Sequence, residues 1–130
     1  LGTLGHSDGD PVLHAVSDAL LGACKMGDIG QMFSNKNNKY KNIRSTLLLK
    51  KIIKLIKLKR YFINNLDINI IIQAPKIQKY KIKMIDSISK LCKISKDQIN
   101  IKGKTTEKLG VIGKEKAVAC EVILSVNKND

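Results

Sequence analysis

Near its start the chain reads His6-Ser7-Asp8-Gly9-Asp10-Pro11-Val12-Leu13-His14-Ala15-Val16-Ser17-Asp18-Ala19, a polar loop that continues into a helix. Asp10 before Pro11 predicts the helix start, because aspartate accepts hydrogen bonds from free N–H groups and proline is tolerated at the first helical position. Gly27 and Gly30 predict where the helix ends. The side chains expected to face the core recur at helical spacing: Leu13, Val16, Leu20, Ala23 and Cys24.

Beyond this helix, apolar periodicity predicts the rest of the fold. Ser45 is expected to cap a second helix with an outward lysine face, and a third helix is expected over 80–92. Strands are expected over 66–73, 100–104 and 117–126. These elements predict an α/β (α+β) sandwich with a single sheet and helices packed on one face. Residues 1–130 are expected to form one domain.

The composition is basic, with a net charge of +13 from 24 Lys+Arg against 11 Asp+Glu. One interpretation is a nucleic-acid or anion-binding module that uses the lysine-rich helix over 50–59. The other is coding bias, since Lys, Asn and Ile are used heavily together and Arg occurs only at 44 and 60. The second interpretation is favoured, because nucleic-acid readers usually exploit arginine. Neither a nucleic acid nor a membrane is expected as a partner.

The three cysteines, Cys24, Cys92 and Cys120, have no C-x-x-C spacing. Each lies in an apolar helix or strand pattern, so they are expected to be reduced core residues. The chain does not begin with methionine, and we expect a further strand in a preceding segment.

The candidate site starts with His14, four residues before Asp18 on one face of the first helix. A metal-ligand imidazole oriented by the carboxylate and a plain surface ion pair are both compatible with that spacing. The preceding His6 and Ser7 favour the site interpretation, because a helix N-terminus attracts phosphate. Asp8 and Asp10 are better explained as loop-holding and capping residues.

Further polar groups follow apolar runs. Asp28 lies in a glycine turn, where it is either a hydroxyl-recognition residue or a simple turn aspartate. Lys76 comes shortly after the strand expected over 66–73. Thr105, Thr106 and Glu107 come directly after the strand expected over 100–104. Ligands favour the carboxyl ends of strands in α/β domains, and magnesium prefers oxygen ligands. The alternative for Thr105 to Glu107 is a capping pattern that opens a short helix.

Taken together, these motifs resemble the 2-C-methyl-D-erythritol 2,4-cyclodiphosphate synthase family of the non-mevalonate isoprenoid pathway. The motifs that carry the resemblance are His6-Ser7-Asp8-Gly9-Asp10, His14-Ala15, Asp18-Ala19-Leu20-Leu21-Gly22-Ala23, Gly27-Asp28-Ile29-Gly30, Gln73-Ala74-Pro75-Lys76 and Thr105-Thr106-Glu107-Lys108-Leu109-Gly110. The resemblance implies a homotrimer with active sites at subunit interfaces. It also implies a phosphorus–oxygen lyase that converts a cytidine diphosphate ester of methylerythritol 2-phosphate to a cyclic diphosphate and CMP.

The resemblance assigns roles to particular residues. It implies zinc, or a similar divalent transition metal, on His14 with Asp18 behind it, and magnesium or manganese on Glu107. It makes His6 and Thr105 catalytic groups at the phosphates. The implied substrate-binding residues are Ser7, Asp28, Ile29, Gly30, Gln73, Ala74, Pro75, Lys76, Ile77, Gln78, Thr106 and Lys114.

The chain also departs from the family pattern. The Asp-x-His motif that supplies two further zinc ligands in the family is absent, and we expect it in the preceding strand. Many members carry Phe and Arg where this chain has Val111 and Lys114, so isoprenoid binding at the trimer axis is not expected. The A/T-rich codon usage favours a plastid-type organelle, apicoplast or chloroplast, over a bacterial cytoplasm.

Overall fold

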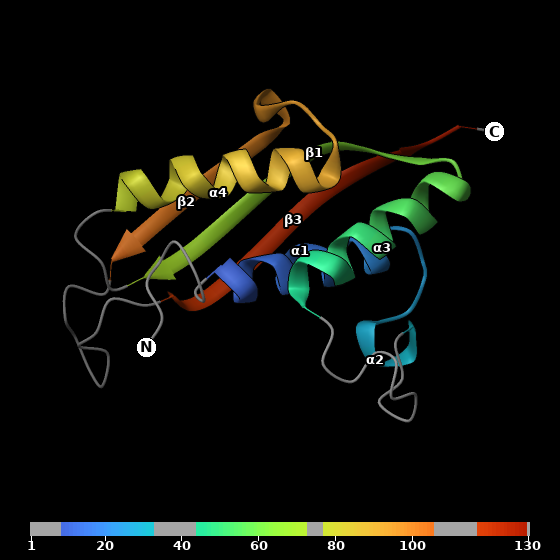
Figure 1. The fold of residues 1–130 in the computed structure, drawn as a ribbon, viewed down its shortest axis with the longest axis horizontal. Coiled ribbons are helices and arrows are strands. Elements are labelled where there is room, and N and C mark those ends of the chain that lie inside the picture. The colour runs from blue at the N-terminus through green and yellow to red at the C-terminus, as the bar shows by residue number, and fades with distance from the viewer. Residues whose placement is uncertain (1–8, 33–43, 73–76, 106–116, 130) are drawn as a thin grey trace.

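The computed structural model describes residues 9–32, 44–72, 77–105 and 117–129 (Figure 1). Its helices are α1 (Gly9–Ala23), α2 (Ile29–Met32), α3 (Ser45–Leu58) and α4 (Ile77–Cys92), with a 3₁₀ turn at Lys96–Gln98. Its strands are β1 (Tyr61–Ile72), β2 (Ile99–Thr105) and β3 (Ala117–Lys128). The elements predicted from apolar periodicity are therefore present, although β1 begins at Tyr61 rather than at Leu66.

The described strands form one sheet in the order β2-β1-β3. β1 is central, parallel to β2 and antiparallel to β3. The parallel register pairs Leu66 with Ile99 and Ile72 with Thr105, so both strands end at the same edge of the sheet. The carboxyl ends of β1 and β2 therefore lie side by side.

Helices α1, α3 and α4 lie over one face of this sheet, as Figure 1 shows. The core between them is aliphatic and includes Leu20 on α1, Ile52 on α3, Ile68 on β1 and Ile88 on α4, each with no exposed side-chain surface. Lys50, Lys51, Lys54 and Lys57 lie on the exposed side of α3, as its amphipathic pattern predicts. The predicted sandwich, with helices on one face of a single sheet, agrees with the structure.

The opposite face of the sheet is not covered by any described helix. It exposes Phe62, Ile71 and Ile123 beside a network of polar side chains. Asn100 and Lys102 each donate a hydrogen bond to Asp67, both at 3.0 Å. The bond from Asn100 and, to a smaller extent, the bond from Lys102 hold the pKa of Asp67 below its ordinary value. This surface, which we call the open sheet face, is thus an ordered polar and apolar patch.

Two predictions about helix starts need correction. Asp10 is the second residue of α1 and not its N-cap, since the helix begins at Gly9. Arg44 occupies the N-cap position of α3, and no side chain caps it there. Asp10 and Ser45 hydrogen-bond to each other instead, the Ser45 hydroxyl donating to the Asp10 carboxylate. Both predicted capping residues thus take part in a tertiary contact between the two helices.

The end of the first helix also differs from the prediction. α1 ends at Ala23, and Gly27 adopts a positive φ of 80° in the turn that follows. Gly30 does not end α1 but lies within the short helix α2. Glycine is required at 27, because an added Cβ would come within 2.3 Å of the Gln31 side chain in a backbone conformation that favours glycine.

Candidate functional site

His14 lies in the second turn of α1, and its side chain is exposed. The side chain of Asp18, one turn later, is exposed as well. The neighbouring Leu13, Val16 and Ser17 are buried, so His14 is on the side of the helix that the core does not use. The structure has no ion pair between His14 and Asp18 among its described residues. An exposed helical imidazole without a carboxylate partner in this region is available to a ligand.

A metal ion is not accommodated by the described residues alone. Zinc needs about three protein ligands in a catalytic site. The described part of the chain contains no group of three or more His, Cys, Asp or Glu side chains that would hold a metal. His14 is thus at most one ligand, and Glu107, the predicted magnesium ligand, lies outside the described residues.

Asp28 is held by a reciprocal cap at the start of α2. Its Oδ1 accepts a hydrogen bond from the Gln31 backbone N–H at 2.8 Å, and Gln31 Oε1 accepts from the Asp28 N–H at 3.2 Å. This is a capping box, and the spacing Asp-x-x-Gln was a signal for it in the sequence. Asp28 remains exposed, so the cap fixes the orientation of a carboxylate that faces solvent.

The carboxyl ends of β1 and β2 form a second location. Thr105 is the last residue of β2 and pairs with Ile72, the last residue of β1. Ile77 begins α4, and Gln78 follows with an exposed side chain. The strands therefore bring together the starts of the segments predicted to bind the diphosphate and the cytidine.

We call the region around Asp28 on α2 the α2 location, and the carboxyl ends of β1 and β2 the strand-end location. The two locations are separate in one chain. In Figure 1, α2 lies beyond the far end of α1, away from the ends of β1 and β2. Asp28, Ile29 and Gly30 are therefore not brought together with Thr105 and Gln78 within the described residues. Other predicted site residues lie outside the described residues: His6, Ser7, Gln73, Ala74, Pro75, Lys76, Thr106, Glu107 and Lys114.

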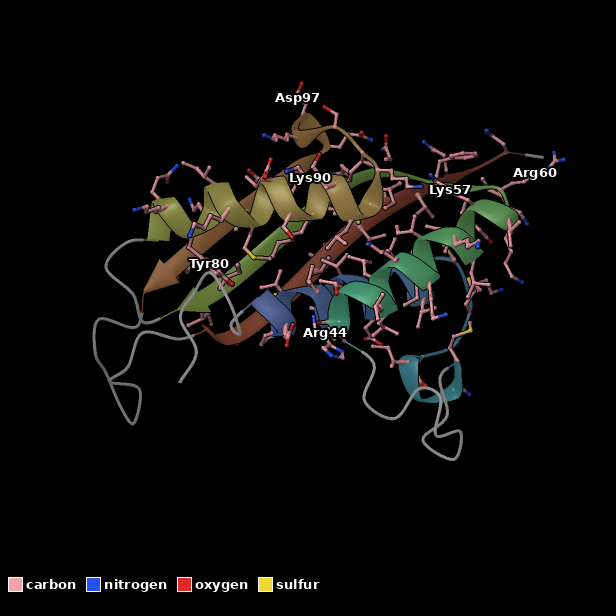
Figure 2. The ribbon with its side chains drawn as sticks, viewed as in Figure 1. Arg44, Lys57, Arg60, Tyr80, Lys90 and Asp97 are labelled. Atoms are coloured by element: carbon pink, nitrogen blue, oxygen red, sulfur yellow. The ribbon has the colours of Figure 1, made fainter. Side chains whose placement is uncertain are left out.

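A basic groove of about 570 Å³ opens elsewhere, between α3 and α4. Its rim has lysines from both helices, and Figure 2 labels Lys57 on α3 and Lys90 on α4. Lys90 is paired with Asp86 at 3.2 Å. The groove contains none of the predicted site residues, so it is not the site that the motifs indicate. Among the described residues, no helix is long and apolar enough to cross a membrane.

The cysteines are free thiols, as expected. Cys24 and Cys92 are buried, whereas Cys120 on β3 is half-buried. Burial raises the pKa of Cys92 to about 12 and that of Cys120 to about 11. A thiol that stays protonated is a poor nucleophile and metal ligand, so these cysteines belong to the core rather than to a site.

The fold and the motif order define a member of one enzyme family. Residues 1–127 match the sequence model of the YgbB family, and the chain belongs to that family. It is 49% identical over 127 residues to the 2-C-methyl-D-erythritol 2,4-cyclodiphosphate synthase of Clostridium botulinum, covering 98% of this chain and 81% of that protein. The family predicted from the motifs is thereby confirmed.

Two further relatives extend the comparison. The chain is 74% identical over 130 residues to the bifunctional enzyme IspD/IspF of Pelagibacter ubique, but it spans only 35% of that protein's length. A solved structure described as IspF of Plasmodium falciparum in complex with CDP is 42% identical, with a TM-score of 0.77. That match covers 96% of this chain and 75% of the solved one.

The expected plastid-type organelle is wrong. Sequence relatives from Pelagibacter ubique and Clostridium botulinum are bacterial and point to a bacterial protein. The expectation depended on the heavy use of Lys, Asn and Ile, which does not distinguish an organelle from a bacterium.

Proposed function

We propose that this chain is the catalytic domain of a 2-C-methyl-D-erythritol 2,4-cyclodiphosphate synthase, with residues 1–130 forming one domain. Its substrate is the cytidine diphosphate ester of methylerythritol 2-phosphate. An oxygen of the 2-phosphate attacks the β-phosphorus, the bond from that phosphorus to the CMP oxygen breaks, and CMP leaves with the electron pair. No water is consumed, and the product is the cyclic diphosphate.

The observation that carries this proposal is His14, which is exposed on α1 beside the buried Leu13 and Val16 and follows the His6-Ser7 pair in the sequence. Phosphoryl transfer depends mainly on positioning and charge neutralisation, and less on a strong base. A rigid helix provides positioning, because α1 packs against both β3 and α3. One similar solved structure is described as a complex with CDP, which has the cytidine and diphosphate groups of this substrate.

Roles for the other residues complete the proposal. His6 and Thr105 contact the reacting phosphates, with Ser7 and Thr106 beside them. Asp28, Ile29 and Gly30 bind the erythritol hydroxyls. Cytidine is bound by the segment from Gln73 through Ala74, Pro75, Lys76 and Ile77 to Gln78, and Lys114 is a further substrate contact.

We further propose that the active protein is a homotrimer whose sites lie between subunits. Two features support this assembly. The α2 location and the strand-end location are separate in one chain, so a neighbouring copy would unite them. The open sheet face also exposes large apolar side chains, such as Ile123 with 62% of its surface exposed. Apolar patches on an ordered surface are typical of subunit contacts.

The proposed cofactors are zinc, or a similar divalent transition metal, and magnesium or manganese. His14 would be one zinc ligand, oriented with the help of Asp18, and Glu107 would hold magnesium. Divalent ions supply charge neutralisation at phosphate oxygens when bound. The remaining zinc ligands must come from outside the described residues.

The test is conversion of the cytidylyl substrate by the full-length protein, followed as CMP release and as cyclic diphosphate by phosphorus NMR. The change His14→Ala should lower turnover by at least about a hundredfold, the usual scale of one positioning or electrostatic group. Lys83→Ala replaces an exposed side chain on α4 and is the matched control, with normal turnover expected. Near-normal turnover by His14→Ala would overturn the assigned role.

A further inference from the structure

The Ser45 hydroxyl links the starts of two helices. It donates a hydrogen bond to Oδ1 of Asp10, 35 residues away in sequence. Ser45 is the first residue of α3 and only 2% exposed, while Asp10 is in the first turn of α1. A buried hydroxyl without a partner is unfavourable by about 1–3 kcal/mol, so this contact is a strong constraint on the distance between the helices.

The Asp10 carboxylate also lies where both helices favour negative charge. The first N–H groups of an α-helix form the positive end of its dipole. α3 has no side-chain cap of its own, because its N-cap residue is Arg44. Figure 2 labels Arg44 at this end of α3, beside α1. One carboxylate therefore serves the starts of α1 and α3 together.

A second contact holds the same end of α1 from another side. Gly9, the first residue of α1, lies against Met84 of α4, and a methyl group added at Gly9 would be 3.5 Å from the methionine Sδ. Met84 is buried, with 6% of its surface exposed. The start of α1 is thus located by α3 through a polar bond and by α4 through packing.

The consequence concerns His14, which lies four residues after Asp10 and so on the same face of α1. We propose that Asp10, held by Ser45, is a positioning residue that fixes the start of α1 and thereby sets His14 for phosphoryl transfer. This inference rests on the proposed function.

The first test compares single substitutions in the full-length protein. Asp10→Ala and Ser45→Ala each remove the bond and should lower kcat about tenfold with KM within about twofold, since small misplacements weaken transition-state contacts most. Asp10→Asn keeps an oxygen acceptor for Ser45 and should retain most of kcat. If Asp10→Asn is as inactive as Asp10→Ala, the carboxylate acts through its charge at the reacting centre, and the positioning role is wrong.

The double variant and a control separate positioning from general loss of stability. Asp10→Ala combined with Ser45→Ala should be no slower than Asp10→Ala alone, because both remove one link. Ser89→Ala on α4 removes a comparable hydroxyl bond, 2.6 Å to the Ile94 carbonyl oxygen. It should lose stability yet keep kcat. Additive losses in the double variant, or an equal kcat loss in Ser89→Ala, would overturn the proposal.

A final measurement does not depend on activity. Amide hydrogen exchange in the first two turns of α1 should quicken about tenfold in Ser45→Ala and remain unchanged in Ser89→Ala. Unchanged exchange at the start of α1 would refute the positioning role even if the enzyme is active. A wild-type protein without synthase activity but with the predicted exchange pattern would instead refute the proposed function and leave the link between the helices intact.

Discussion

At the scale of single residues, Asp28 combines an observed structural role with the proposed binding role. Its Oδ1 accepts the Gln31 N–H and caps α2, yet the carboxylate is exposed. A cap of this kind is worth about 1 kcal/mol, and it also fixes the rotamer. The cap therefore holds the exposed Asp28 carboxylate in one orientation, as the proposed recognition of a hydroxyl requires.

This arrangement gives the first prediction for the proposed reaction. Asp28→Ala should raise KM by about 10–100-fold, because hydrogen bonds to a charged group contribute about 1.5–3 kcal/mol. Gln31→Ala removes only the reciprocal bond to the Asp28 N–H and should change KM by less than about threefold. Steady-state kinetics of both variants check this. Equal KM values for wild type and Asp28→Ala would mean that Asp28 is a turn residue only.

The second prediction concerns pH and Cys92. Burial raises the pKa of its thiol to about 12 in the folded protein, whereas the pKa of an exposed thiol is about 8.5. Between these values the unfolded chain binds fewer protons, so the free energy of unfolding falls as pH rises. The contribution is complete below the unfolded pKa and is lost progressively toward the folded one.

Urea unfolding at pH 8 and pH 10, with reductant, measures this effect. Wild type should lose about 2 kcal/mol more than Cys92→Ala over that interval. Titrating lysines and the other two cysteines are common to both proteins and cancel in the comparison. An equal loss in the two proteins would show that the Cys92 thiol titrates normally in the fold.

At the scale of elements, α1 contains a buried polar atom without a partner. The Ser17 side chain is fully buried, and its Oγ has no hydrogen-bond partner among the described residues. Ser17→Ala should raise the free energy of unfolding by about 1 kcal/mol, since it removes an unsatisfied hydroxyl and improves helix propensity. Ser89→Ala should lower it by a similar amount. Equilibrium denaturation of both variants tests the opposite signs.

The elements also show what the sequence predicted well. α3 and α4 have strong 3.6-residue periods, and their buried residues, such as Ile52 and Ile88, follow directly from that spacing. α2 was not predicted, because four residues carry too little periodicity to be recognised. The cap that holds it was visible as Asp28-x-x-Gln31, a local signal that the glycine turn obscured.

At the scale of the whole molecule, the site was only partly predictable. Motif order identified the family, whereas the metal role of the exposed His14 stays a prediction. The contact between Asp10 and Ser45 was not predictable, since local rules assign each residue to cap its own helix. Nor does one sequence say which residues meet across copies of the chain, because periodicity and spacing describe a single chain.

The open sheet face provides the last prediction, on assembly. Ile123 on β3 and Ile82 on α4 are each 62% exposed, but they lie on opposite sides of the molecule, one on the open sheet face and one on the helical layer. If copies pack through their sheets, Ile123→Lys places a charge in an apolar contact and should dissociate the trimer, because an unpaired buried charge is strongly unfavourable. Ile82→Lys should leave the mass by light scattering unchanged.

Turnover should fall with the trimer fraction in Ile123→Lys, since the α2 and strand-end locations would then no longer meet. A fully active monomeric Ile123→Lys protein would mean that one chain completes the site, and a trimer lost only in Ile82→Lys would place the subunit contact on the helices.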